Sequence, residues 1–380
     1  MLSDGIRPVT ELRVVRAEGD PYARGEVLGR ELRDLINESL DFYHRYFARR
    51  GVSSRELQEL LTPFLVAAET QFPNHVATLN GMAAGATIPI LELFAVNAFE
   101  ELEPILETPE GAMPFLQRKE GHVIAPKRSD GTPDRCTSFA VRTPDATILA
   151  HSEHWLAGDL GNVAVVIDVP DDRPVRVASP TVACCLPAVG VNSHRAGVGV
   201  TSLTANDDGI GVPRVLASRH VLDSADRRDA IARADLPDRS GGYGYTFAFA
   251  GGDAFTLETT GRRMSVLEER AHTNHYVDTE LASIGAEPSA GSRARLDRVT
   301  ELLATEPRTV EDVMEVLRDH GSSPQAICLH PDPAEGDEAS AVMFAMVAEL
   351  EQGRMWVAPG NPCQNEFEEI DVNEVVGGRT

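Results

Sequence analysis

Lysine is almost absent from this sequence of 380 residues, in which only Lys119 and Lys127 occur. Acidic residues outnumber basic ones, with 59 Asp and Glu against 35 Lys and Arg, which gives a net charge of −24. A surface with this charge repels phosphate backbones and anionic lipids. The charge balance therefore argues against nucleic acids and membranes as partners.

Long apolar runs and cysteines are scarce too. No apolar run approaches the roughly 20 residues of a membrane helix. The first residues have neither the basic region nor the apolar stretch of a signal peptide, so we expect a cytoplasmic protein. The five cysteines are too few for a disulfide scaffold, and the lack of a Cys-x-x-Cys pair argues against a zinc cage of thiolates.

The chain is long enough for one large domain or two smaller ones, and its pattern changes once, near residue 130. Before that point apolar residues recur every three or four positions, which predicts helices. Ser53 and Ser54 are suited to cap one helix, and Gly81 and Gly85 favour close packing of another. The expected elements are a strand at 11–15 and helices at 21–50, through 57–65 and at 90–102.

A polar segment rich in Gly and Pro, residues 110–134, is predicted to be a surface loop. After it, the apolar residues follow the period of two that is typical of strands. The expected strands are 136–141, 147–150, 163–168, 198–201, 245–249 and 343–347, with helices at 213–223, 225–234, 293–304 and 310–320. A block of strands with helices before and among them predicts a layered α+β fold rather than a strict βαβ alternation.

Cys136 is the residue most suggestive of chemistry, because it begins a predicted strand directly after the polar loop. If the peptide bond between Arg135 and Cys136 were cut, the cysteine would gain a free α-amino group. An α-amine has a pKa of about 7.7–8.0 and a thiol one of about 8.5, so the amine can accept the thiol proton near neutral pH. The thiol itself can make the cut by attacking the carbonyl of Arg135. Composition alone favours the ordinary interpretation of Cys136 as a half-buried strand residue.

Several short segments that carry a family resemblance follow one another between about Asp20 and Cys363. They are Gly81–Ala86, Cys136-Thr137-Ser138, Ala217–Leu222, His272–Tyr276, Ser292–Arg295 and Gly360–Cys363. Together they resemble the isopenicillin N acyltransferase family, the acyl-coenzyme A:6-aminopenicillanic acid acyltransferases. Members of this family are N-terminal-nucleophile hydrolases, which mature by self-cleavage before a Cys-Thr pair.

The resemblance implies an α+β fold, the four-layer αββα sandwich of N-terminal-nucleophile hydrolases. Residues 1–135 would form a helical N-terminal segment that becomes the small subunit, and residues 136–380 the core and large subunit, within one structural domain. Cys136 would both cleave the bond after Arg135 and accept the acyl group. Asn274 matches the oxyanion-hole asparagine of the family, and Thr137 would orient the amine or the scissile peptide.

The sequence departs from the family pattern at three places. His154 stands where an aspartate is expected, so either Glu153 replaces the carboxylate or His154 carries protons near its reference pKa of about 6.5. Glu338-Ala339 stands where the penicillin-acting members carry a Ser-Arg pair, which favours a linear amide as substrate. Arg135 replaces the glycine that precedes the nucleophile of the penicillin enzyme.

Three other interpretations remain open. His151, Glu153 and His154 are candidate metal ligands, although their spacing matches neither H-E-x-x-H nor H-x-x-E-H, and a strand would turn His154 away from the other two. A papain-like Cys–His peptidase would use His272 or His275 as its base, but the sequence lacks the pattern around the cysteine that this class carries. The third interpretation is a catalytically degenerate family member that binds a ligand.

We therefore predict a self-processing cysteine amidohydrolase or acyltransferase, which acts on a small amide or acyl-thioester through an acyl-enzyme. Its predicted site residues are Cys136, Asn274, Thr137 and His154 for catalysis, with Glu153, Trp155 and His272 for substrate binding. No metal or redox cofactor is expected, whereas acyl-CoA is a candidate co-substrate. The expected partners are the small-molecule substrate and the cleaved N-terminal segment, and assembly into a homo-oligomer is left open.

Overall fold

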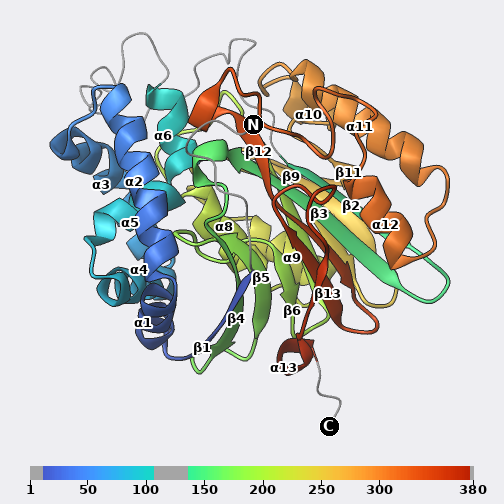
Figure 1. Ribbon diagram of the computed structural model, residues 1–380, viewed down its shortest axis with the longest axis horizontal. Coiled ribbons are helices and arrows are strands. Elements are labelled where there is room, and N and C mark those ends of the chain that lie inside the picture. Colours follow the sequence, from blue (N-terminus) through green and yellow to red (C-terminus); the bar gives the residue numbers. More distant parts are fainter. Residues whose placement is uncertain (1–11, 107–135, 377–380) are drawn as a thin grey trace.

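Two stacked β-sheets form the centre of the computed structural model, which describes residues 12–106 and 136–376 (Figure 1). Within these residues the first sheet has eight strands and the second has six. The first contains, in spatial order, β1 (Arg13–Gly19), β4 (Val163–Pro170), β5 (Val177–Val182), β6 (Gly190–Asn192), β7 (Ala196–Leu203), β8 (Gly242–Phe249), β9 (Ala254–Thr259) and β10 (Met264–Leu267). The second contains β11 (Ala271–His272), β2 (Thr137–Arg142), β3 (Thr147–Leu156), β12 (Ser340–Glu349), β13 (Arg354–Pro359) and β14 (Glu368–Ile370).

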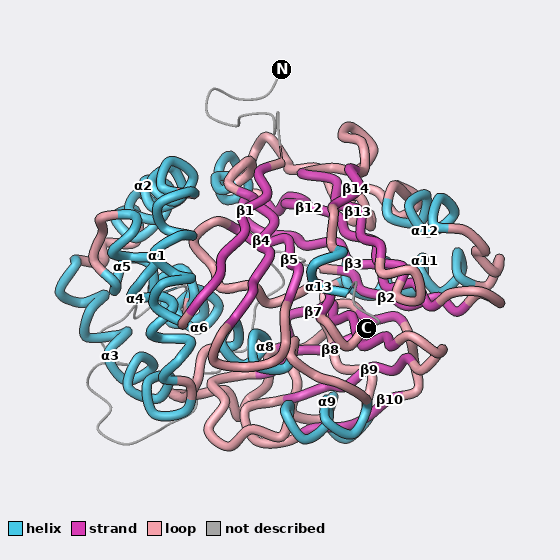
Figure 2. Tube along the Cα trace, turned by 90° about the horizontal axis from the view of Figure 1, so that it is seen from below, coloured by secondary structure: helices cyan, strands magenta, loops and turns pink. Residues whose placement is uncertain are grey.

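Helices lie outside this pair of sheets (Figures 1 and 2). They are α1 (Pro21–Glu31), α2 (Arg33–Arg49), α3 (Ser54–Gln71), α4 (Pro73–Ala86), α5 (Ile90–Asn97), α6 (Phe99–Leu106), α8 (Arg214–Val221), α9 (Arg227–Ala234), α10 (Thr279–Ala282), α11 (Ala290–Leu303), α12 (Val310–Leu317) and α13 (Asn373–Val376). An apolar cluster joins α11 and α12 to the second sheet, while α8 packs against the first. The described residues thus form the αββα sandwich expected from the sequence.

The N-terminal segment shares its core with the rest of the chain. Strand β1 lies parallel to β4 at the edge of the first sheet, and the buried guanidinium of Arg24 pairs with the carboxylate of Asp168 at 2.8 Å. Helices α1 and α4 cross at close range, because a Cβ at Gly81 would lie 2.0 Å from the carbonyl oxygen of Tyr22. This contact confirms the close helix packing that the small residues predicted.

Strand β7 comes close to the inner face of the second sheet at Gly199. A Cβ added there would lie 2.6 Å from Oγ of Ser138 and 3.3 Å from Cβ of His151. Glycine at this position therefore leaves room for two polar side chains between the sheets, and both are fully buried.

The structure corrects several predicted boundaries. The helix predicted at 21–50 is interrupted at Leu32, where the backbone leaves helical geometry with φ −108° and ψ 12°, and the one predicted at 90–102 is interrupted at Ala98. Ser53 caps α3 as predicted, and Glu56 completes a capping box. The apolar pattern carried no separate signal for β5, β6, β9, β10, β11, β13 and β14. The loop predicted at 110–134 lies outside the described residues.

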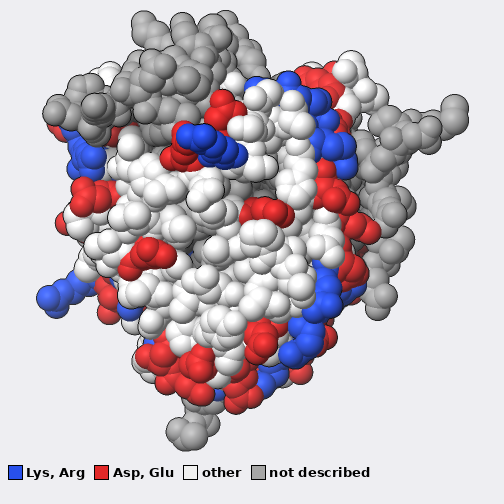
Figure 3. Space-filling view, turned by 90° about the vertical axis from the view of Figure 1, so that its left-hand side faces the viewer, with Lys and Arg blue, Asp and Glu red and all other residues white. Residues whose placement is uncertain are grey.

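No helix in the two described ranges is long and apolar enough to cross a membrane. Figure 3 shows the face on the side of the N-terminal helices, where acidic side chains gather along the lower edge beside a broad uncharged area. The excess of acidic residues is thus unevenly distributed over this face.

Candidate active site

Cys136 lies directly before β2, at the entrance of the second sheet. Its side chain is buried and lines a cavity with about 530 Å³ of empty space, open solvent included. Its φ is 27°, a value that residues with a side chain rarely adopt, so the backbone is strained at the predicted cleavage point. Arg135, on the other side of that bond, lies outside the described residues.

The walls of this cavity are mostly apolar. The apolar side chains are Trp155, Pro180, Val182, Leu186, Ala188, Val189, Val200, Val215, Tyr243 and Phe344. The polar and thiol side chains are Glu100, Cys136, Glu153, Thr181, Cys185 and Ser202. Among the described lining residues there is no Lys, Arg or His, whereas two carry carboxylates. The cavity is therefore suited to an apolar group beside a neutral or cationic one.

The thiol of Cys136 donates to a carboxylate. Its Sγ lies 3.2 Å from Oε1 of Glu153 and 4.0 Å from the carbonyl oxygen of His154. Burial raises the pKa of this thiol well above its ordinary value, and the negative charges of Glu153 and Glu100 raise it further. In the described arrangement the sulfur is thus a protonated donor, and a reaction needs a group that takes this proton.

A chain of hydrogen bonds leads from the thiol into the space between the sheets. Oε2 of Glu153 lies 3.0 Å from Nε2 of His151, and Nδ1 of the same ring lies 2.7 Å from Oγ of Ser138. His151 and Glu153 share one face of β3 because strand residues two apart point the same way. Opposite them, β12 contains a bulge between Val342 and Phe344, a feature often found beside active sites.

The ring of His154 faces away from this chain. Its Nε2 lies 2.9 Å from Oγ of Ser152 and 3.1 Å from the carbonyl oxygen of Ile327. Burial lowers the pKa of the ring well below its ordinary value, and the ring is therefore neutral. Only the backbone carbonyl of His154 lies near the thiol, so this geometry does not support the proton-carrying role considered for the ring.

Asn274 is held by two hydrogen bonds just behind the cavity. Its Nδ2 donates to the carbonyl oxygen of Ser202 at 3.3 Å, and its Oδ1 accepts from Nη2 of Arg295 at 2.8 Å. The guanidinium of Arg295, fully buried, fixes which end of the amide is the donor. Asn274 is not itself among the residues that line the cavity, but the carbonyl oxygen that its amide contacts belongs to Ser202, which does line it.

Of the other predicted site residues, Trp155 lines the cavity, whereas Thr137 and His272 are not among its lining residues. Nε1 of Trp155 donates to the hydroxyl of Tyr43 in the N-terminal segment. Thr137 is fully buried beside Cys136, and within the described residues its Oγ1 has no hydrogen-bond partner.

Both ring nitrogens of His272 are already engaged. Its Nδ1 lies 2.5 Å from Oγ1 of Thr201, and its Nε2 lies 2.8 Å from Oε1 of Glu258. His275, the other candidate for a papain-like pair, places Nδ1 2.8 Å from Oγ of Ser292. Neither ring lines the cavity, so the geometry does not support His272 or His275 as the partner of Cys136 in a Cys–His dyad.

Sequence reasoning missed Glu100 and Phe344 as cavity residues. Glu100 is an acidic residue in a predicted helix, which usually indicates a solvated face, and it accepts from Oγ of Ser202 at 2.5 Å. The candidate metal ligands also differ from those expected from the sequence. Ligand atoms of Cys136, His151 and Glu153 lie within 4.8 Å of one another, and His154 is not part of this group.

Residues 188–364 match the family model of acyl-coenzyme A:6-aminopenicillanic acid acyl-transferase. The match confirms the resemblance that the sequence motifs indicated, and it includes Asn274 and Arg295 but begins after Cys136 and Glu153. Among solved structures, the chain is similar to penicillin V acylase from Agrobacterium tumefaciens, with 13% sequence identity and a TM-score of 0.45. That similarity covers 64% of this chain and 88% of the other. No curated protein matches the sequence.

Proposed function

We propose that this protein is a self-processing cysteine amidohydrolase or acyltransferase whose nucleophile is Cys136. The observation that carries the proposal is the thiol of Cys136, which lies directly before strand β2, lines a cavity and lies 3.2 Å from a carboxylate oxygen of Glu153. The family match over residues 188–364 supports the same kind of chemistry independently of the nucleophile. Cleavage before Cys136 would provide the α-amine, and residues 1–135 would remain bound as the small subunit.

In the proposed reaction, the sulfur of Cys136 attacks the carbonyl carbon of an amide while its proton passes to the freed α-amine or to Glu153. The carbon–nitrogen bond then breaks, and the leaving amine takes up that proton. The product at this stage is a thioester on Cys136. Water attacks the thioester, releases a carboxylic acid and restores the thiol; an amine in place of water would give acyl transfer.

Asn274 is the proposed donor to the oxyanion that forms in the tetrahedral intermediate. An amide NH₂ group that contacts the cavity residue Ser202, on a side chain held by Arg295 at 2.8 Å, needs little reorganisation when the negative charge develops. Arg295 acts as a positioning residue, because it contacts the carbonyl end of the amide; of the two N–H donors at the other end, one meets the carbonyl oxygen of Ser202 and the second is left for the substrate. Thr137, next to Cys136, is proposed to orient the amine.

The two carboxylates of the cavity favour some amide substrates over others. Apolar walls are suited to an aliphatic or aromatic acyl group, while Glu100 and Glu153 repel anions and attract a cationic amine. We therefore propose N-acyl amines with an apolar acyl group as substrates, and hydrolysis rather than transfer from the polyanionic acyl-CoA. The proposed reaction uses no metal or redox cofactor.

The first test combines intact mass with a substrate panel. Purified protein is expected to give fragments of residues 1–135 and 136–380 in denaturant, which migrate together under native conditions. N-acyl amines with cationic leaving groups should be hydrolysed faster than those with carboxylate leaving groups, and a mass increase of one acyl group should fall on the fragment that begins at Cys136. An active preparation whose chain stays uncut would contradict the role of the α-amine.

A second test measures the thiol of Cys136 in Glu153→Gln. Removing this negative charge lowers the pKa of the thiol, so iodoacetamide should label Cys136 faster than in the wild type at neutral pH. Turnover should nevertheless fall, because a proton acceptor is lost. Asp145→Asn, an exposed change in the turn at the far end of the same hairpin, should alter neither. Unchanged labelling in Glu153→Gln would count against the contact between the two side chains.

A further inference from the structure

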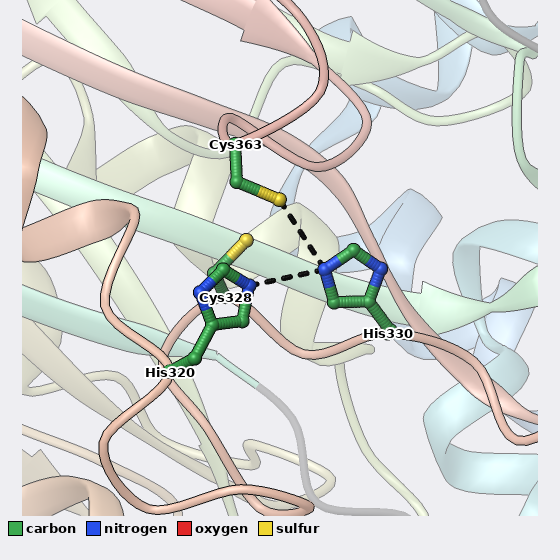
Figure 4. A group of neighbouring side chains, drawn as sticks. All are labelled: His320, Cys328, His330 and Cys363. Atoms are coloured by element: carbon green, nitrogen blue, oxygen red, sulfur yellow. Dashed lines mark hydrogen bonds between the residues drawn. The ribbon is translucent and has the colours of Figure 1, made fainter.

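A second cluster of reactive side chains lies away from the cavity, on the loops beyond the second sheet. His320, Cys328, His330 and Cys363 direct one nitrogen or sulfur atom each toward a common point (Figure 4). These four ligand atoms all lie within 4.8 Å of one another. None of the four lines the cavity at Cys136, and the proposed reaction does not use them.

We propose that these four residues bind one zinc ion. Two thiolates and two imidazoles are a ligand set that zinc prefers in closed, structural sites. Neighbouring ligand atoms around tetrahedral zinc are about 3.3–3.8 Å apart, given Zn–N and Zn–S bonds of about 2.0 and 2.3 Å. Here Nε2 of His320 and Nε2 of His330 are 3.1 Å apart, and Sγ of Cys363 is 3.2 Å from Nε2 of His330. These separations are slightly shorter than in a filled site, so small side-chain movements would admit the ion.

Neighbouring groups orient the ligands as supporting groups do in known metal sites. Nδ2 of Asn361 donates to Sγ of Cys328 at 3.4 Å and to the carbonyl oxygen of Leu329 at 2.7 Å. The N–H of Cys328 donates to the carbonyl oxygen of Asp319 at 3.1 Å, which keeps the segment that carries His320 beside it. Burial raises the pKa of the Cys328 thiol to about 11, and the hydrogen bond from Asn361 acts in the opposite direction, toward the thiolate that a metal requires.

The ion would tie together two connecting segments that have little regular structure of their own. His320 follows α12, Cys328 and His330 lie in the long connection between α12 and β12, and Cys363 lies in the turn after β13. Long connections without regular structure are uncommon inside compact folds, and a metal that joins distant segments stabilises such a region. The sequence argued against zinc because it lacks a Cys-x-x-Cys pair, but ligands from separate segments need no such pair.

The proposed zinc site is also connected to the cavity through the backbone. The carbonyl oxygen of Ile327, the residue before the ligand Cys328, accepts a hydrogen bond from Nε2 of His154 at 3.1 Å. His154 directly follows Glu153 on β3. Zinc would thus hold the loop that packs against the strand carrying the carboxylate beside Cys136.

The proposal is tested by the metal content of the full chain purified without chelator from cells supplied with zinc. We expect about one zinc ion per chain, and Co²⁺ in its place should give the visible absorption of a tetrahedral site with thiolate ligands. Cys363→Ala should lose the stoichiometric zinc, and because Cys363 is exposed this variant should fold. A chelator should lower the melting temperature of the wild type but not that of Cys363→Ala.

Control variants distinguish the four-residue cluster from a second place where zinc could bind. His44→Ala and Cys184→Ala remove a histidine and a cysteine outside the cluster and should keep the zinc. Zinc that persists in Cys363→Ala but is lost in Glu153→Gln would assign the ion to Cys136, His151 and Glu153 and overturn the proposal. A wild-type chain without zinc, with a mass that indicates a disulfide between Cys328 and Cys363, would overturn it as well. None of these readouts depends on the proposed hydrolase activity.

Discussion

A Cys136→Ala chain is expected to remain a single polypeptide and to hydrolyse N-acyl amines no faster than the uncatalysed background. The substitution removes the only atom that the proposed mechanism uses as nucleophile, both for cleavage and for the acyl-enzyme. The cavity walls do not depend on the sulfur, so the variant should still bind substrate. Denaturing gels, intact mass and a hydrolysis assay measure these properties on one preparation.

Cys136→Ser and Cys184→Ala are the matched variants for this experiment. The serine hydroxyl is a weaker nucleophile at neutral pH than a thiol, so we expect slow or absent cleavage and a large loss of turnover. Cys184 is buried outside the cavity, with Sγ 3.6 Å from the carbonyl oxygen of Ile36, and its alanine variant should be cleaved normally. Full activity in Cys136→Ala would show that another group is the nucleophile and would refute the proposed function.

Asn274→Asp is expected to lower kcat by about 10²–10³-fold, the effect of losing one oxyanion donor in other enzymes. Aspartate has nearly the same shape and can still accept from Nη2 of Arg295, which lies 2.8 Å from the amide oxygen. It lacks the NH₂ group, and it adds a negative charge where the oxyanion would form. The prediction is therefore a fall in kcat with a much smaller change in KM, measured by steady-state kinetics.

Arg295→Lys provides the comparison for the positioning role. Lysine retains the charge but not the planar geometry that meets the amide oxygen, so kcat should fall less than in Asn274→Asp. Circular dichroism and thermal melting serve as checks that both variants are folded. If Asn274→Asp keeps kcat within a few-fold of the wild type, the oxyanion donor is some other group.

The fold was predictable where the pattern of apolar residues determined it. The strands at 163–168 and 343–347 and the cap at Ser53 follow from period and side-chain chemistry, and the structure has all three. The break at Leu32 was not predictable from period, because apolar spacing continues across it while the helical backbone does not. Strands such as β5 contain Pro180 and small polar residues, so their strand propensity is weak and their pairing depends on the neighbouring strands.

The site was predictable in part for a similar reason. The alternation along a strand predicted that His151 and Glu153 share a face and that His154 points away, and the hydrogen bonds of these side chains agree. The contribution of Glu100 was not predictable, because it depends on how α6 packs against the sheets. The cluster at His320 was missed because its members come from two separate connections that only the tertiary fold brings together.

The position of the edge strand β1 determines how the protein could refold once the proposed cleavage has taken place. Its hydrogen-bond partner β4 would then belong to a different polypeptide, and so would Asp168, the partner of Arg24. The uncut chain brings these pieces together at the high effective concentration of a tether, whereas two separated fragments would have to meet by diffusion. A mature molecule that once unfolds would reassemble in a second-order process, so its persistence depends on slow unfolding rather than on reversible equilibrium.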